Sequence, residues 1–522
     1  MATIYWAGGT DTDIDDFNNY VTSANGTSVI SDNSGDFSGD DVIFQSLALS
    51  NVSRNPTVNA NETFNSIRID SGCTLTGNAS YSITVDGEAD GTGTTEAGYA
   101  VDIHGALGTN VNIILATNTS TLIDFGNATS GTVHNLTVTN GINYPQTATS
   151  LAGNLTINGG TFNTDSDTAL TVTGTTTVAG TLICNGSTVI LGSGYTAGYA
   201  LIGDGTVNFG TGTTTVGAVN TDSASGITKA SGTITFNTTQ SGGASIGPAV
   251  TNSNSHFNFG SSTVNFDLSG GAGSNFAIEQ HVGSSKTFTI TAATVNYKSN
   301  GNIYQGNSNT NIFKIIGNFV IDASKTFKTF YDDSNDYGSK IEVTGDVTVN
   351  GILNAYSASN PKAMEFGSLT IASGGEYSAT SGTTTLKSET SGGSTYVNDG
   401  TFTHNNGTLL LHADIPDTQV YAGSSSLYNV TSSTGNNVWL KENITIANDL
   451  TITSGTFGSG GGNDKEVTVH GNVFISGGEF GNGSETGAYT VKGLVTLTGG
   501  TFDLSSGTIN LGGIRNAGGT IS

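Results

Sequence analysis

Short stretches of alternating apolar and polar residues recur along the chain, each followed by glycine and then by a large apolar residue. In the copy at 153–162, Leu155 and Ile157 alternate with Thr156 and Asn158. Successive side chains of a β-strand point to opposite faces, so this alternation predicts a strand with one buried and one exposed face. We expect the glycines to turn a corner, because they tolerate positive φ, and the phenylalanine that closes the copy to return to the core.

The copies recur at a nearly constant period. Equivalent positions lie 21 to 23 residues apart in the pairs Leu155 and Thr176, Val347 and Leu369, Leu450 and Val473, and Val473 and Val495. A fixed period of this size with strand alternation inside it is typical of a solenoid, whose units stack and bury a continuous core. The sequence therefore predicts an all-β fold, a parallel β-helix (β-solenoid) with rungs of about 21–31 residues.

A second phrase marks the middle of the chain, where a threonine precedes an apolar residue and an aromatic residue follows two positions later. Its apolar residues are Val207, Ile234, Val264 and Val295, at steps of 27, 30 and 31 residues. Taken as equivalent positions, they predict longer rungs with extra loop, part of it apolar at 275–278. Lengthened turns are where solenoids commonly carry their functional surface.

The pattern divides the chain into four parts. Residues 1–60 are acidic and the least repetitive. We expect them to form an N-terminal cap or docking segment, because the first rung would otherwise expose a sheet edge. Residues 61–330 are predicted to be solenoid with lengthened central turns, 331–344 an interruption, and 345–522 regular solenoid.

Composition narrows the function. The 522 residues include 75 Gly and only 5 Pro, and 11% are charged, so the polar surface is mainly Thr, Ser and Asn. With 41 acidic and 15 basic residues the net charge is −26, which repels phosphate backbones and anionic membranes, so nucleic acid is not an expected partner. The absence of a long apolar run predicts no membrane insertion, and the polar N-terminus predicts no signal peptide.

Only weak candidates for special chemistry stand out. Asp11, Asp13 and Asp15 have the spacing of the first ligands of a calcium loop. Asp16 occupies the position of the sharp-turn glycine and Thr22 that of the bidentate glutamate, which favours a solvated acidic turn over a Ca²⁺ site. The same half-motif recurs at Asp332, Ser334 and Asp336. No other cofactor is expected. The two cysteines, Cys73 and Cys184, are expected to be buried and unpaired.

Glycan-cleaving enzymes need two carboxylates roughly 5–10 Å apart, which adjacent rungs could supply. The glutamates considered for this role are Glu376, Glu389, Glu442, Glu466, Glu479 and Glu485. They form no cluster with His, Arg or aromatic residues in the sequence, and no two of the seven histidines have the spacing of a helical metal site. We therefore expect no catalytic residue. Trp6 and Trp439 fit either a core position or an exposed platform for sugar stacking.

Several segments carry a family resemblance: Trp6–Gly9 leading to Asn18–Tyr20, Ser38–Ile43, Pro56–Asn59, and the repeats of Leu-Thr-Ile and Gly-Thr-Phe type. The chain resembles the Gly/Thr/Asn-rich parallel β-helix virion proteins of tailed, marine-type bacteriophages, which serve as tail fibres, tailspikes and head fibres.

The resemblance implies a structural or receptor-binding appendage at the virion surface, outside the cell. The expected partners are other virion proteins and a host-surface glycan or protein receptor, and a homotrimer is compatible with the pattern. Two alternatives remain open. One is a bacterial surface adhesin or surface-layer-like subunit, and the other is a tailspike glycan hydrolase or lyase.

Overall fold

The computed structural model describes residues 2–24, 26, 28–30, 37–46, 55–91, 97–126, 128–165, 167–192, 199–220, 226–237, 244–246, 255–267, 276–280, 286–305, 311–330, 339–356, 361–390, 392–412, 415, 417–460, 464–483, 486–503 and 507–522. The chain divides into two compact units, described separately below. Unit 1 comprises residues 1–240 and 258–262, and unit 2 comprises residues 241–257 and 263–522.

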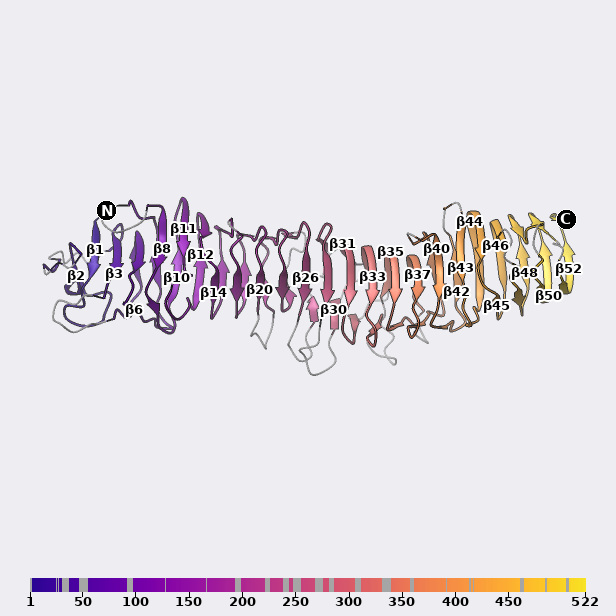
Figure 1. Ribbon diagram of the computed structural model, residues 1–522, viewed down its shortest axis with the longest axis horizontal. Helices are drawn as coiled ribbons and strands as arrows, with labels where there is room; N and C mark the ends of the chain where they lie inside the picture. The colour runs from indigo at the N-terminus through magenta and orange to yellow at the C-terminus, as the bar shows by residue number, and fades with distance from the viewer. Residues whose placement is uncertain are drawn as a thin grey trace. The chain divides into compact units, whose positions relative to one another are not determined.

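Unit 1 is a parallel β-solenoid, as the alternation predicts. One of its rungs consists of β15 (Leu155–Ile157), β16 (Thr161–Asn163) and β17 (Leu170–Val172). Each strand pairs in parallel with its counterpart one rung along, namely β18 (Thr176–Val178), β19 (Thr181–Ile183) and β20 (Val189–Leu191). The three strands of a rung therefore belong to three faces around a common core. Figure 1 shows successive strands of unit 1, among them β14 (Thr149–Leu151) and β20, side by side.

One face of unit 1 is a parallel sheet whose strands follow in chain order. They are β4 (Glu62–Phe64), β7 (Ile83–Val85), β10 (Asn112–Leu115), β12 (Asn135–Val138), β15, β18, β21 (Leu201–Ile202) and β24 (Val219–Asn220). Leu155 and Ile157 are fully buried, whereas Asn158 is exposed. The inward and outward positions read from the sequence are confirmed here.

Unit 2 has the same architecture with several longer strands. One face contains β27 (Ala244–Ile246), β30 (Phe276–Gln280), β32 (Gly301–Gln305), β34 (Thr326–Lys328), β36 (Ile352–Asn354), β38 (Glu376–Ser378) and β41 (Thr401–Thr403). The other faces include β31 (Thr287–Tyr297), β33 (Ile312–Ile321), β35 (Lys340–Val349), β37 (Met364–Ile371), β39 (Thr383–Leu386), β42 (Thr408–Leu411), β44 (Asn429–Leu440), β46 (Leu450–Ser459), β48 (Val473–Ile475) and β50 (Tyr489–Leu497). Within the segment 275–278, expected as loop, residues 276–278 belong to strand β30. Residue 275 and residues 331–338 of the expected interruption lie outside the described residues.

The predicted registers hold where whole copies of the repeat are compared. Leu155 pairs with Thr176, Val347 with Leu369, and Val473 with both Leu450 and Val495. The step from Val207 to Ile234 is wrong. Val207 lies in β22 (Thr206–Asn208) and pairs with Ile227, 20 residues along the chain, whereas Ile234 pairs with Thr214 on another face.

The corner glycines serve two purposes. In the C-terminal copies Gly455, Gly478 and Gly500 adopt positive φ (69°, 71° and 66°), as expected, whereas Gly159 and Gly160 do not. A Cβ atom on Gly160 would instead lie 2.5 Å from the carbonyl oxygen of Asn140, in the rung before. The equivalent glycines of the next rungs, Gly180 and Gly205, show the same conflict at 2.3 and 2.4 Å. These corners need glycine because adjacent rungs stack too closely there for a side chain.

Polar ladders also connect the rungs. The Asn135 Oδ1 accepts a hydrogen bond of 2.8 Å from the backbone N–H of Asn154, and Asn154 Oδ1 accepts one of 2.9 Å from that of Thr175. A Cβ on the intervening Gly153 would lie 2.3 Å from Asn135 Oδ1. In the recurrent Gly-Asn dipeptide, the asparagine side chain accepts a hydrogen bond from the next rung, and the glycine leaves space for the asparagine side chain of the rung before.

The first rungs of unit 1 carry a distinct aromatic cluster. β1 (Thr3–Trp6) pairs antiparallel with β2 (Tyr20–Val21) and parallel with β3 (Asp41–Phe44). Trp6 is buried and packs edge-on against Tyr20, with ring centroids 5.4 Å apart. Among the described residues the one helical element is a 3-10 turn, η1 (Phe17–Asn19), so none has the length or apolar character of a membrane-spanning helix. Cys73 and Cys184 are free and buried, as expected.

Candidate ligand-binding hollow

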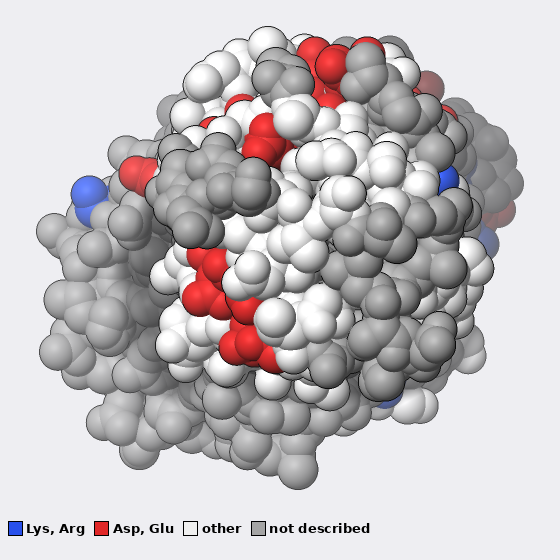
Figure 2. Space-filling model, turned by 90° about the vertical axis from the view of Figure 1, so that its left-hand side faces the viewer, with Lys and Arg blue, Asp and Glu red and all other residues white. Residues whose placement is uncertain are grey.

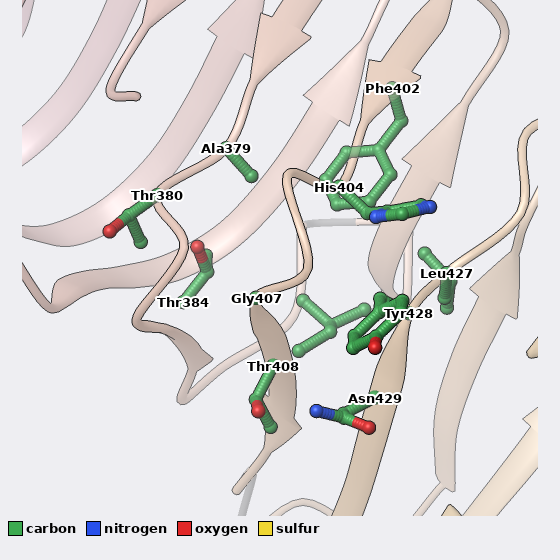
Figure 3. A pocket seen from close by; sticks show the side chains of 11 residues that line it. Ala379, Thr380, Thr384, Phe402, His404, Gly407, Thr408, Leu427, Tyr428 and Asn429 are labelled. Atoms are coloured by element: carbon green, nitrogen blue, oxygen red, sulfur yellow. The ribbon is translucent and has the colours of Figure 1, made fainter. Parts of the chain in front are cut away.

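Two adjoining hollows lie at a corner of unit 2, where three successive rungs meet. The corner is formed by the turn after β38, the turn between β41 and β42, and the residues that lead into β44. Strand pairing sets this arrangement, because β38 is in register with β41 and β39 with β42. The corner therefore gathers residues that lie some 50 positions apart in the sequence (Figure 3).

The hollows are defined by their linings. The inner hollow, of about 10 Å³, is lined by Ala379, Thr380, Thr384, Phe402, His404, Gly407, Thr408, Leu409, Leu427, Tyr428 and Asn429. The outer hollow, of about 460 Å³, is lined by Tyr356, Phe402, Thr403, His404, Asn405, Asn406 and Ser426. The inner one has room for a single water molecule, whereas the outer one has the volume of a small-molecule site.

The rings of Phe402 and His404 line both hollows, whereas the ring of Tyr428 lines only the inner one. His404 stacks on Tyr428 with centroids 5.1 Å apart and an angle of 30° between the rings, and both side chains are half-buried (Figure 3). Tyr356, on the outer side, is 39% exposed. Flat, partly exposed rings of this kind provide apolar contact area with little loss of conformational freedom on binding.

The turn after β41 holds the His404 ring in one orientation. The backbone N–H of Asn406 donates to His404 Nδ1 at 3.0 Å, and Asn405 Nδ2 donates to the carbonyl oxygen of Ala379 at 2.8 Å. Both asparagines adopt positive φ, at 45° and 61°, which this residue type tolerates. Burial lowers the pKa of His404, so the ring is neutral at pH 7 and carries its proton on Nε2, which faces away from the turn's hydrogen bond.

The chemistry of the hollows is uncharged throughout. Among the described residues that line them, none is Asp, Glu, Lys or Arg, and the polar groups are hydroxyls, amides and one neutral imidazole. Such a lining can hydrogen-bond a neutral polar ligand and pack against its apolar face. It offers no carboxylate pair for acid–base cleavage of a glycosidic bond.

The structure places the predicted calcium residues in an acidic turn of unit 1. Asp11 Oδ1 accepts from Asn19 Nδ2 at 2.7 Å, and Asp15 Oδ1 accepts from Asn59 Nδ2 at 2.7 Å, so two of the three carboxylates are directed at different partners. Desolvation and the negative charges of Asp11, Asp15 and Asp16 raise the pKa of Asp13. Figure 2 shows acidic side chains gathered on this N-terminal face of unit 1.

No group of three His, Cys, Asp or Glu residues is arranged to hold a metal ion in the part of the chain that the structure describes. Calcium binding by Asp11, Asp13 and Asp15 stays a prediction. The second half-motif, at 332–336, lies outside the described residues, as do Glu485 and His281.

The two tryptophans differ in environment. Trp6 is 1% exposed and belongs to the core of the first rungs. Trp439 is half-buried on the outer face of β44, where its Nε1 donates to Asp417 Oδ1 at 2.7 Å. Sequence reasoning did not single out Tyr428, and it treated His404 only as one of seven histidines. The two rings meet because β42, which follows His404, pairs with β44, which follows Tyr428, and no local pattern shows this pairing.

The comparisons with known proteins give no relative. No known protein family, curated protein or solved structure matches the chain. Function therefore has to be argued from the site and from the chemistry of the surface.

Proposed function

We propose that the chain is a structural and receptor-binding appendage of a phage virion, and that it attaches to a glycan on the host surface through the outer hollow. The observation that carries the proposal is the uncharged, aromatic-walled lining of this hollow at a corner of the solenoid. The resemblance of the sequence to virion β-helix proteins supports the same class.

A sugar ring suits the outer hollow for a physical reason. A pyranose presents a face of C–H groups that packs on an aromatic ring, and a rim of hydroxyl groups that need donors and acceptors. The rings of Tyr356 and His404, which line the outer hollow, supply the apolar face, and the exposed Thr403 and Asn406 side chains supply the donors and acceptors. Because the scaffold is a stack of hydrogen-bonded strands, the site is rigid before the ligand arrives, which lowers the entropic cost of binding.

The rest of the chain has a place in this proposal. Residues 1–60 would dock to other virion proteins, and the solenoid, alone or as a homotrimer, would present the hollow outside the cell. The abundance of Thr, Ser and Asn on the surface, with 11% charged residues overall, supports contact with hydroxyl-rich polymers. The proposal is one of binding without cleavage.

The hollow is tested by removing the ring that supports His404. The glycan that the wild type recognises is first identified on an array of bacterial surface polysaccharides. We expect Tyr428→Leu, which keeps an apolar side chain but removes the ring on which His404 stacks, to weaken binding to that glycan about tenfold. Tyr81→Leu, which removes a half-buried tyrosine of unit 1, is the matched control and should bind as the wild type does.

Unchanged glycan binding by Tyr428→Leu would reject the hollow as the site. Mass spectrometry of virus particles purified from the source tests the virion assignment separately. Absence of the chain from particles, together with its presence in cell-envelope fractions, would favour the surface adhesin. Release of reducing ends from a bound polysaccharide would favour the glycan-cleaving spike.

A further inference from the structure

A compact group of charged side chains lies on the outer surface of unit 2, away from the hollows described above. Lys314 of β33, Glu342 of β35 and Glu365 of β37 occupy one outward row, because strand pairing sets Lys314 against Glu342 and Glu342 against Glu365. Lys340 projects beside Glu342, and Lys387 follows β39 in the next rung. Four successive rungs thus contribute five charges to one place.

The contacts within this group leave one positive charge in excess. Lys340 Nζ lies 2.8 Å from Glu342 Oε1 and 2.5 Å from Glu365 Oε1, and so bridges the two carboxylates. Lys387 also forms an ion pair with Glu365, and Lys314 Nζ lies 3.7 Å from Glu342 Oε2. Three ammonium groups therefore surround two carboxylates.

The two glutamates have the adjacent-rung placement of a catalytic carboxylate pair, but the protonation of Glu365 does not suit that role. Burial alone would raise the pKa of Glu365, yet the hydrogen bonds from Lys340 and Lys387 outweigh it and the pKa is lowered. Burial opposes the charge of Lys340, but its bonds to both glutamates raise its pKa. A general acid needs a raised carboxyl pKa, so Glu365 does not suit that role and acts through its charge.

The two outer lysines are accessible to a ligand. A hollow of about 230 Å³ lies against the group, lined by Lys314, Glu342, Val343, Thr344, Glu365, Phe366, Gly367 and Lys387. The side chains of Lys387 and Lys314 are 50% and 35% exposed, whereas Lys340 is held deeper. Exposed ion pairs of this kind contribute little stability, so an incoming anion can share these ammonium groups without disturbing the bridge at Lys340.

The net charge of −26 does not prevent an anion from binding here. At physiological salt, charges farther away than about 8 Å are largely screened, so the local excess of one positive charge dominates at the hollow. A carboxylate is the anion that fits best, because the row already alternates ammonium and carboxylate groups at the rung spacing. The exposed Thr344 hydroxyl at the same hollow suits the hydroxyl groups of a sugar.

We propose that this lysine hollow is a second ligand subsite, which binds the carboxylate of an acidic sugar residue in the receptor glycan through Lys314 and Lys387. The inference rests on the proposed function, since it names the chemical class of the receptor as a uronic-acid-containing polysaccharide.

The test uses the full chain and a defined probe. Calorimetric titration with an oligomer of glucuronic acid is compared with titration with the same oligomer after its carboxyl groups are reduced to neutral hydroxymethyl groups. We expect the wild type to bind the acidic oligomer at least tenfold more tightly than the reduced one. Lys314→Met combined with Lys387→Met should remove this preference. Lys492→Met, at an exposed lysine of β50, is the charge control and should keep it.

Each remaining outcome overturns the inference. A double variant that keeps the preference, or a wild type without measurable binding to the acidic oligomer, rejects the subsite. If Lys492→Met loses the preference for the acidic oligomer to the same extent, the effect is due to net charge. If the wild type binds a poly(glycerol phosphate) more tightly than the acidic oligomer, the hollow is a site for phosphate polymers. Failure of the proposed function can be distinguished from failure of this inference. If only the proposed function fails, Tyr428→Leu binds the recognised glycan like the wild type, whereas the double lysine variant still loses the preference for the carboxylate.

Discussion

Replacement of Gly180 by alanine is expected to lower the free energy of unfolding by about 3 kcal/mol, the upper part of the range for inserting atoms into a well-packed site. Gly180 has no positive φ, so backbone strain is not the reason. The added Cβ would lie 2.3 Å from the carbonyl oxygen of Gly160 and 2.9 Å from Ile157 Cγ2. The rungs would have to separate at this corner.

That separation has a direct cost in hydrogen bonding. The carbonyl oxygen of Gly160 accepts from the N–H of Thr181 at 3.0 Å, and the N–H of Gly180 donates to the carbonyl oxygen of Ile157 at 2.9 Å. Both bonds connect the same two rungs, so relief of the clash stretches the bonds that define the rung spacing of about 4.8 Å. Solenoid stability is a sum of terms between neighbouring rungs, and the damage should be local.

The measurement is a thermal melt of the full chain combined with hydrogen exchange of the backbone amides. We expect a lower melting temperature in Gly180→Ala and faster exchange at the amides of β18 and β19. The matched control is Gly392→Ala. At Gly392 the nearest atom to a built Cβ is 3.6 Å away and φ is not positive, so stability should stay within about 0.5 kcal/mol. Equal melting of the two variants would show that the rungs can separate at no cost.

Gly180 also illustrates what the sequence could and could not predict. The alternation of Leu155 to Asn158 is a local property, and it correctly separated inward from outward side chains and identified the solenoid. Positive φ, the expected reason for the corner glycines, holds at Gly455, Gly478 and Gly500. It does not hold at Gly160 and Gly180, where the reason is an atom one rung away. A local sequence pattern shows the two-residue period of a strand. It does not show how closely that strand packs against a strand from another part of the sequence.

The wrong register at Val207 has a related cause. The phrase around Val207 belongs to β22, whereas the similar phrase around Ile234 belongs to a strand on another face of the rung. Period-two alternation distinguishes inside from outside but is the same on all three faces. Only the lengths of the connecting turns decide which face a strand joins, and the sequence pattern leaves those lengths open.

The candidate sites were beyond sequence reasoning for the same reason. His404 and Tyr428 are 24 residues apart in the sequence, and Glu342 and Glu365 are 23 apart. The contact within each pair can therefore be predicted only when the length of the rung is known. One sequence signal for the charged group was nevertheless present. Lys314 and Glu342 occupy the same outward position in strands of similar pattern, and an alignment of rungs by their buried residues would have stacked them.

Among the described residues, Lys229 is the one lysine buried in the core. Backbone hydrogen bonds place Phe209, Lys229 and Phe259 at equivalent positions of three successive rungs. The two phenylalanines are fully buried and Lys229 is 2% exposed. An ammonium group therefore stands where the neighbouring rungs bury an aromatic ring.

Among the residues that the structure describes, the surroundings of Lys229 supply hydrogen-bond acceptors but no countercharge. Its Nζ donates to the carbonyl oxygens of Gly212 and Phe209 and to the Thr214 hydroxyl. Burial lowers the pKa of Lys229 to about 8, with a small opposing effect from Cys184. Burial also raises the pKa of the Cys184 thiol to about 12, so this group stays neutral and does not balance the ammonium charge below that pH.

The protein should consequently become more stable as the pH rises from about 8 towards 10.5. In this window the unfolded chain keeps the proton on Lys229 while the folded chain releases it, so the unfolded state binds more protons and stability increases with pH. Below about pH 8 both states are protonated and this contribution is constant. One pKa unit corresponds to about 1.4 kcal/mol, so we expect a gain of about 2 kcal/mol between pH 7.5 and 9.5.

Lys229→Met isolates this effect, because methionine fills a similar volume and cannot titrate. The melting temperatures of the wild type and the variant, measured from pH 7.5 to 9.5, should show the wild type gaining stability relative to the variant as the pH rises, since all other titrating groups are shared. A difference that stayed constant or reversed would mean that the three oxygen acceptors hold the ammonium group charged in the core. In that case Lys229 would act as an internal cation that fixes the corner of its rung.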